Sequence, residues 1–258
     1  MNNSYQEYVE FANQLADEAS KSSMQYFRKK LSIDQKKDMS PVTVADQNTE
    51  IKIREMINKK YPNHGILGEE FESINPNSEF VWVIDPIDGT RSFIAGHKDF
   101  GNLIALTQNN NPILGIINCP AHQERWVGII DKETTMNNNV VKTSGTTLIN
   151  ESHFCTSGLY LEDDHFKKSC DKIINQTKYY RLGGDCYMYG MVASGLIDIV
   201  LEDTLKTHDY MALIPVIEGA GGVVTDKYGN SVTTRSEGSI VASANNSLHN
   251  QIIDIINN

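Results

Sequence analysis

The stretch from Phe80 to Thr90 constrains this chain more than any other segment. Phe80–Ile84 is a continuous apolar run, which predicts a buried β-strand. Asp85 and Asp88 follow directly, and Thr90 begins a segment that we expect to form the first turn of a short helix. A strand that ends in acids and turns into a helix can hold divalent cations, which take oxygen ligands, beside an anion bound at free backbone N–H groups.

A simpler interpretation of the same residues is a turn. Asp-Pro and Asp-Gly are common turn dipeptides, and Asp is a good N-cap. Two further acids favour a metal site over a turn. Glu69 lies shortly upstream in Gly68-Glu69-Glu70, and Asp209 lies far downstream at an expected helix start.

The chain resembles the inositol monophosphatase superfamily over nearly its whole length. The resemblance rests on motifs in matching order: Gly68-Glu69-Glu70, Asp85–Thr90, His208-Asp209 and Glu218–Gly222. The runs Thr90–Gly96 and Gly183–Tyr187, the latter continued by Ala193–Gly195 and Pro215–Gly222, are most similar to its histidinol-phosphate phosphatase branch. The resemblance implies a layered αβαβα sandwich of the inositol monophosphatase and fructose-1,6-bisphosphatase type.

The resemblance also implies a metal-dependent phosphomonoesterase. It assigns a first Mg²⁺ to Glu69, Asp85 and the backbone carbonyl of Ile87. It assigns a second Mg²⁺ to Asp85, Asp88 and Asp209, so that Asp85 bridges the two ions. A third, weaker Mg²⁺ is expected near Glu69, and Mn²⁺ is an alternative to Mg²⁺.

Roles for the water and the phosphate follow from the same resemblance. Thr90, held by Asp46, and Glu69 position the attacking water, while the amides of Gly89 and Thr90 bind the phosphate. Asp46 also has a local explanation, because Thr43 with an acid three residues later is typical of a helix capping box. In the family, the segment equivalent to 36–40 can approach the active site.

Substrate choice is expected to depend on the second half of the chain. Asp185 and Glu202 correspond to positions that line the leaving-group pocket, next to Asp88 and Asp209. Two acids suit a cationic alcohol, and histidinol carries an ammonium and a titrating imidazole. His208 stands where many relatives carry tryptophan, and we do not expect it to be a ligand.

The resemblance therefore indicates hydrolysis of L-histidinol phosphate in histidine biosynthesis. Inositol monophosphate and a nucleotide 3′-phosphate are alternative substrates for the same chemistry. A third hypothesis is a catalytically inactive regulatory relative. The presence of Glu69, Asp85, Asp88 and Thr90 argues against that hypothesis.

The pattern of elements predicts two halves, 1–145 and 146–258. The first half is expected to be α+β, with helices over 4–29 and 44–60 and an antiparallel meander over 100–130. The second half alternates strands and helices, as α/β structures do. Within it, Asp209 should begin a long helix that Pro215 kinks. The remaining loop histidines, His97 and His122, are expected at the surface.

Composition excludes several classes of function. The 258 residues carry a net charge of −10, which disfavours nucleic-acid binding. No apolar run approaches the ~20 residues needed to span a bilayer. Four dispersed cysteines are expected to be free thiols in a reducing cytoplasm, and the polar segment 1–7 is not typical of a signal peptide. A homodimer is expected by analogy with the family.

Overall fold

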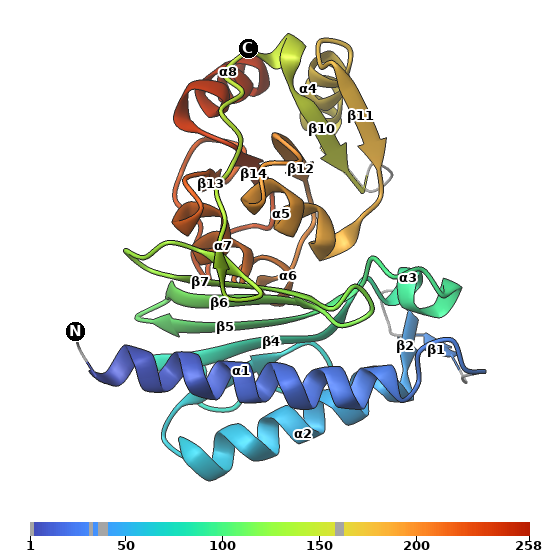
Figure 1. The fold of residues 1–258 in the computed structure, drawn as a ribbon, viewed down its shortest axis with the longest axis vertical. Coiled ribbons are helices and arrows are strands. Elements are labelled where there is room, and N and C mark those ends of the chain that lie inside the picture. Colours follow the sequence, from blue (N-terminus) through green and yellow to red (C-terminus); the bar gives the residue numbers. More distant parts are fainter. Residues whose placement is uncertain (1–2, 31–32, 36–40, 158–162) are drawn as a thin grey trace.

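The computed structural model describes residues 3–30, 33–35, 41–157 and 163–258. Its layers alternate helix, sheet, helix, sheet and helix, so the predicted αβαβα sandwich is confirmed (Figure 1). The segment 36–40, expected near the active site, lies outside the described residues. The division into halves at residue 145 stays a prediction.

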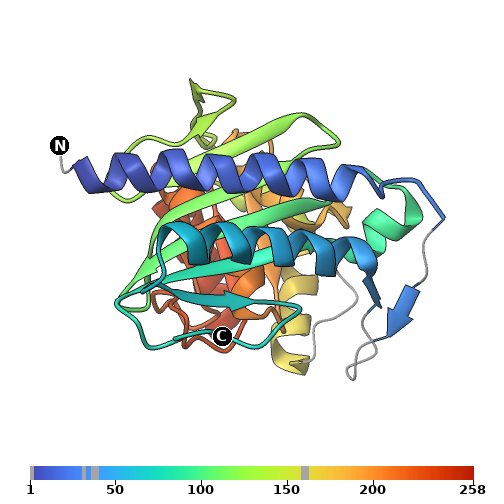
Figure 2. The same ribbon diagram turned by 90° about the horizontal axis from the view of Figure 1, so that it is seen from below.

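The first outer layer consists of α1 (Asn3–Met24) and α2 (Val44–Lys60). Seen from below, the two helices run side by side across one face of the first sheet (Figure 2). The bounds of α2 match the prediction, whereas α1 ends five residues before the predicted 29, in turns around Arg28, whose φ is +58°. The short strands β1 (Ile33–Gln35) and β2 (Pro41–Thr43) pair between the helices in sequence.

The first sheet contains the central apolar run as β4. In spatial order its strands are β3 (Gly65–Gly68), β4 (Phe80–Asp88), β5 (Gly101–Gln108), β6 (Asn111–Cys119), β7 (Glu124–Ile129), β8 (Thr135–Met136) and β9 (Asn139–Val140). The predicted meander is β5–β6–β7, which pairs antiparallel throughout. Strand β4 extends beyond the predicted Ile84 to Asp88, with a shift of its register against β5 between Asp85 and Asp88. The strand therefore does not end at Ile84 as expected, but continues through an irregular segment that contains Asp85 and Asp88.

The second sheet lies above the first. Its strands in spatial order are β11 (Tyr179–Leu182), β10 (His153–Thr156), β12 (Ile199–Glu202), β14 (Ile240–Ser243) and β13 (Val223–Thr225). The outer helices α4 (Asp164–Ile174) and α8 (Asn246–Asn257) cover its far face, and the 3₁₀ turn η1 (Ile149–Glu151) precedes β10 (Figure 1). The parallel pairing of β10 with β11 and β12 agrees with the predicted α/β pattern.

The middle layer contains α5 (Asp185–Ala193), α6 (Thr207–Tyr210) and α7 (Leu213–Gly219). The long kinked helix predicted from Asp209 is wrong, because the chain breaks at Met211–Ala212. Pro215 explains the break, since its ring clashes with the carbonyl four residues earlier, at Met211. Pro215 is the third residue of α7, and an N–H in the first turn of a helix has no intrahelical acceptor, so its absence costs no hydrogen bond there.

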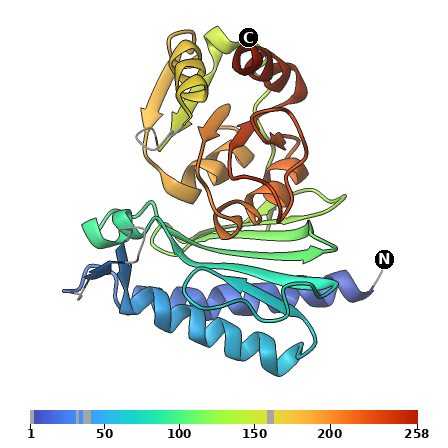
Figure 3. The same ribbon diagram turned by 180° about the vertical axis from the view of Figure 1, so that it is seen from behind.

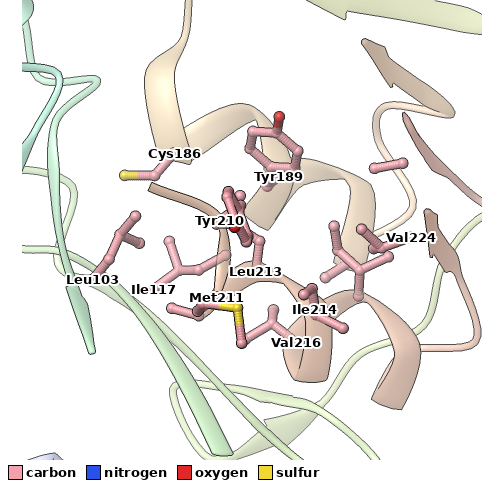
Figure 4. Packing of buried hydrophobic residues seen from close by; sticks show 14 of the residues in the cluster. Leu103, Ile117, Cys186, Tyr189, Tyr210, Met211, Leu213, Ile214, Val216 and Val224 are labelled. Atoms are coloured by element: carbon pink, nitrogen blue, oxygen red, sulfur yellow. The ribbon is translucent and has the colours of Figure 1, made fainter. Parts of the chain in front are cut away.

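Apolar side chains from both sheets bury the middle layer. Leu103 and Ile117 of the first sheet face Met211 and Leu213, and Tyr189 packs from above (Figure 4). This cluster fixes α5 and the α6–α7 segment against the strands that carry the acids. Helix α3 (Thr90–Ala95) lies outside the layers, at the end of the sheet below β11 (Figure 3).

Candidate metal and substrate site

The register shift in β4 brings together carboxylates from distant segments. Ligand oxygens of Asp85, Asp88 and Asp209 all lie within 4.8 Å of one another. A second group within the same limit contains Glu69, Asp85 and a ring nitrogen of His208. Asp85 belongs to both groups, which is the geometry that a bridging ligand requires.

Burial and mutual repulsion perturb these carboxyls. Asp85 is 2% exposed, and its burial, with Glu69 and Asp88 nearby, raises its pKa well above the ordinary range. Burial also raises the pKa of Asp88, with smaller contributions from Asp185 and Asp209. Carboxylate oxygens are the ligands that Mg²⁺ takes in proteins, so the residues present fit a divalent cation.

Ile87, a predicted site residue, and His208, which was not expected to be a ligand, make contacts that the sequence did not indicate. The Ile87 carbonyl, predicted as a metal ligand, accepts a hydrogen bond from the Thr90 hydroxyl at 3.1 Å. His208 is buried, with its Nε2 3.5 Å from an Asp209 carboxylate oxygen. Its position beside Glu69 and Asp85 is compatible with coordination, which we did not expect of it.

Helix α2 begins at the site through Thr43 and Asp46. The Asp46 carboxylate accepts hydrogen bonds from the Thr43 amide at 2.8 Å and hydroxyl at 2.6 Å, so the capping box is confirmed. Its other oxygen accepts a hydrogen bond from the Thr90 hydroxyl at 3.3 Å. Asp46 therefore makes both the local and the long-range contact expected of it.

Gly89 makes the turn between β4 and α3. Its φ is +79°, in the region that favours glycine, and a Cβ there would lie 2.8 Å from Cγ of Asp185. The Asp185 carboxylate accepts a hydrogen bond from the Ser92 hydroxyl at 2.5 Å. The expected phosphate loop and the expected substrate acid are thus in direct contact, although 96 positions separate Gly89 from Asp185.

Helix α5 connects Asp185 to the metal site. Its next residue, Cys186, donates its backbone N–H to the Asp88 carboxylate at 2.6 Å. Asp185 itself has a φ of +44°, an uncommon conformation for a residue other than glycine. Strained backbone of this kind persists where the surroundings fix it, which is frequent at functional sites.

Glu202, at the end of β12, is buried and hydrogen-bonded. Its carboxylate accepts hydrogen bonds from the Ser157 hydroxyl and, at 2.7 Å, from the Tyr189 hydroxyl. Burial raises its pKa to about 7, while these hydrogen bonds act in the opposite direction. Sequence reasoning missed both hydroxyl donors. For Tyr189 a signal existed, because it follows Asp185 by one helical turn.

A cavity of about 520 Å³ joins the metal-site acids to the pocket acids. Asp88, Asp209, Asp185 and Glu202 all line it. Its remaining lining residues are Arg91, Ser92, Ser157, Gly183, Cys186, Tyr189, Asp203, Thr204 and Leu205. Acids of the carboxylate cluster and the two expected substrate acids therefore share one cavity.

His122 is half-buried and has partners that the sequence did not indicate. Its Nε2 lies 3.1 Å from the Asp99 carboxylate, and its ring stacks on Tyr187 with centroids 4.1 Å apart. Asp99 also pairs with Arg181 at 3.0 Å. His97 is exposed, as expected.

The four cysteines, Cys119, Cys155, Cys170 and Cys186, are buried and free. Within the part of the chain that the structure describes, no helix combines the length and apolar character needed to cross a membrane.

Comparison with known proteins gives a consistent result. The model of the inositol monophosphatase family matches residues 4–258. A histidinol-phosphatase of Chlorobaculum parvum is 36% identical, over 97% of this chain and 96% of that protein. The bifunctional phosphatase IMPL2, chloroplastic, of Arabidopsis thaliana is 38% identical, over 96% of this chain and 74% of that protein.

A solved structure shares the fold as well as the sequence. An inositol monophosphatase from Zymomonas mobilis superposes with a TM-score of 0.90 at 38% identity, over 98% of this chain and 99% of that chain. Enzymes of this family generally depend on Mg²⁺, which agrees with the carboxylate cluster. The chain belongs to the inositol monophosphatase family and is a phosphoric monoester hydrolase.

Proposed function

We propose that this chain is a Mg²⁺-dependent phosphatase that hydrolyses L-histidinol phosphate to L-histidinol and phosphate. The observation that carries the substrate assignment is that Asp185 and Glu202 line the same cavity as Asp88 and Asp209. The Chlorobaculum parvum relative, which is named as a histidinol-phosphatase, supports this assignment. The reaction would contribute to histidine biosynthesis.

The metal ligands in this proposal are four carboxylates and a backbone carbonyl. Glu69 and Asp85, with the Ile87 carbonyl, would hold one Mg²⁺, and Asp85, Asp88 and Asp209 would hold another. A third ion near Glu69, and Mn²⁺ in place of Mg²⁺, are compatible with the same donor set. When bound, the ions neutralise charge that develops on the phosphoryl group and the leaving oxygen.

The remaining steps fall to residues of the chain. The amides of Gly89 and Thr90, at the start of α3, bind the phosphate. The Thr90 hydroxyl, fixed by Asp46 at 3.3 Å, orients the attacking water together with Glu69. No covalent nucleophile is required, because phosphoryl transfer depends mainly on positioning and charge stabilisation.

The leaving alcohol lies beside Asp185 and Glu202 in the cavity. Ser92 fixes the Asp185 carboxylate, and Ser157 and Tyr189 fix that of Glu202. A carboxylate that a hydroxyl donor has oriented keeps lone pairs that can accept hydrogen bonds from an ammonium or an imidazolium. A neutral polyol would gain less from Asp185, which therefore carries more of the substrate assignment than Glu202.

Inositol monophosphate is the second candidate substrate. Glu202 could accept hydrogen bonds from ring hydroxyls as readily as from a cation, and the Zymomonas mobilis neighbour is named for inositol monophosphate. A nucleotide 3′-phosphate and a non-catalytic regulatory role are less well supported. Neither alternative gives a role to the two acids Asp185 and Glu202.

Phosphate release with Mg²⁺ distinguishes these candidates. The substrates are L-histidinol phosphate, myo-inositol 1-phosphate and adenosine 3′,5′-bisphosphate, each with and without EDTA. We expect kcat/KM to favour histidinol phosphate at least about a hundredfold, or about 2.7 kcal/mol. A preference for inositol phosphate would overturn the substrate, and absence of any EDTA-sensitive release would overturn the activity.

We also propose that the chain is a cytoplasmic homodimer. The exposed edge strand β11, with Tyr179, Tyr180 and Leu182 more than half exposed, supports pairing of two copies. Sedimentation equilibrium of the wild-type chain tests the dimer, and a monomer at micromolar concentration would contradict it.

A further inference from the structure

We propose that Glu50 and Arg54 are positioning residues for Glu69, and that α2 thereby sets the spacing between Glu69 and Thr90. The inference rests on the proposed function, in which Glu69 is a metal ligand and Thr90 orients water. Neither Glu50 nor Arg54 lines the cavity or belongs to the carboxylate groups.

Glu50 and Arg54 form a buried ion pair on α2. Arg54 Nε lies 2.7 Å from Glu50 Oε1, and the exposed fractions of the two residues are 0% for Glu50 and 8% for Arg54. Removing two charges from water is costly, and an apolar pair of similar volume often stabilises a fold equally well. Stability alone therefore explains this pair poorly.

The pair binds the backbone that follows Glu69. Glu50 Oε2 accepts the N–H of Glu70 at 2.8 Å. Arg54 donates from its two terminal nitrogens to the carbonyls of Phe71, at 2.9 Å, and Glu72, at 3.0 Å. Three consecutive residues after the metal ligand are thus fixed by one guanidinium–carboxylate pair. Apolar side chains could not make these bonds.

The backbone before Glu69 packs on the same pair. A Cβ added at Gly68 would lie 2.1 Å from Glu50 Oε1 and 2.9 Å from Arg54 Nη2. Such distances are shorter than real Cβ contacts, so only glycine allows this approach. The Glu50–Arg54 pair therefore contacts the loop on both sides of Glu69.

Helix α2 connects this loop to the phosphate loop. Asp46, Glu50 and Arg54 are spaced by four residues and lie on one face, with a rise of about 6 Å between successive members. Asp46 binds Thr90, and Glu50 binds the residue after Glu69. A single rigid helix thereby holds the water-orienting hydroxyl and the metal ligand at a fixed separation.

Metal affinity tests the proposal apart from turnover. The variant Glu50→Leu/Arg54→Met replaces the pair with apolar groups, so that no buried charge is left unpaired. We expect it to unfold at nearly the wild-type temperature but to bind Mn²⁺, measured by electron paramagnetic resonance of the free ion, about tenfold more weakly. The Mn²⁺ concentration for half-maximal activity should rise by the same factor.

Two further variants and one control complete the experiment. Arg54→Lys keeps the charge but cannot form the fork to both carbonyls, so we expect Mn²⁺ affinity to fall about threefold. Glu50→Gln keeps one acceptor oxygen and replaces the other with an NH₂ donor, so it loses the contact to either Arg54 or Glu70, and affinity should again fall about threefold. Glu55→Gln, an exposed acid on the same helix, should change nothing.

Wild-type Mn²⁺ affinity in the folded double variant would overturn the proposal. If the double variant does not fold, wild-type affinity in Arg54→Lys would do so. Failure of the wild-type chain to bind Mn²⁺, or binding that survives in Asp88→Asn, instead overturns the proposed metal site. The two failures are therefore distinguishable.

Discussion

The two acidic regions of the site differ in what surrounds their carboxylates. At the end of β4, Asp85 and Asp88 face other carboxylates and accept hydrogen bonds from backbone N–H groups. In the pocket, Asp185 and Glu202 accept hydrogen bonds from side-chain hydroxyls. The first arrangement concentrates negative charge, which a bound cation can offset and which raises the pKa of Asp85 and Asp88 in its absence. The second orients separate acids toward a shared space. The first is suited to catalysis and the second to recognition.

The strongest test of this comparison is Asp88→Asn, which removes one charge from the concentrated cluster. We expect kcat/KM to fall by more than about a thousandfold, or about 4 kcal/mol, because the amide weakens a metal ligand. The fold should persist, since Asn retains the acceptor for the Cys186 amide. Steady-state kinetics and circular dichroism measure the two effects. Near-normal turnover would remove Asp88 from the metal site.

The catalytic region was readable from the sequence because much of it is contiguous. Asp85, Asp88 and Thr90 lie within six positions, and a strand followed by a helix brings them together locally. The capping box at Thr43 was likewise fixed by spacing alone. Most elements were predicted within a few residues, because each depends on local periodicity or on glycine and proline.

The recognition region could be predicted only by its two acids. Ser92, Ser157 and Tyr189 reach Asp185 and Glu202 through the packing of both sheets on the middle layer, which periodicity does not encode. The pairing of His122 with Asp99 was missed for the same reason. The break between α6 and α7 was missed because a proline permits either a kink or a new helix start.

The pH dependence of the free energy of unfolding tests whether Glu202 of the recognition region is protonated in the folded chain. Its pKa is about 7 in the folded chain against 4.5 ordinarily. The folded carboxyl therefore keeps its proton to higher pH, and stability falls as pH rises from 4.5 to 7. At about 1.4 kcal/mol per pKa unit, the loss is about 3 kcal/mol at most.

Glu202→Gln removes this dependence and keeps an acceptor for the Tyr189 hydroxyl. Urea unfolding in EDTA at pH 5 and pH 8 should show a smaller loss of stability in the variant than in the wild type. Asp85 and Asp88 also have raised pKa values, but both proteins contain them, so their effect cancels. Equal losses in both proteins would mean that Glu202 is already ionised at pH 5.

Thr90→Ala tests the hydroxyl between the two regions. Loss of the group that Asp46 orients should lower kcat about a hundredfold, or about 2.7 kcal/mol, because the water is no longer held in place. Thr90→Ser keeps the hydroxyl and should stay within about threefold of the wild type. Stopped assays at saturating Mg²⁺ measure both variants. Equal rates for Ala and Ser would exclude a role for the hydroxyl.

Asp185→Ala has the smallest expected effect and bears most directly on recognition. Removal of one acid should raise KM for histidinol phosphate about tenfold, or about 1.4 kcal/mol, because a charge-assisted hydrogen bond to the leaving alcohol is lost. KM for inositol phosphate should change less, since that alcohol is neutral. The substitution should leave the backbone at Gly89 unchanged, because the turn there depends on the φ of +79° that glycine itself adopts. Parallel KM measurements on both substrates decide the matter. Equal increases would mean that Asp185 shapes the phosphate loop by contact alone, and the pocket would then belong to the catalytic region after all.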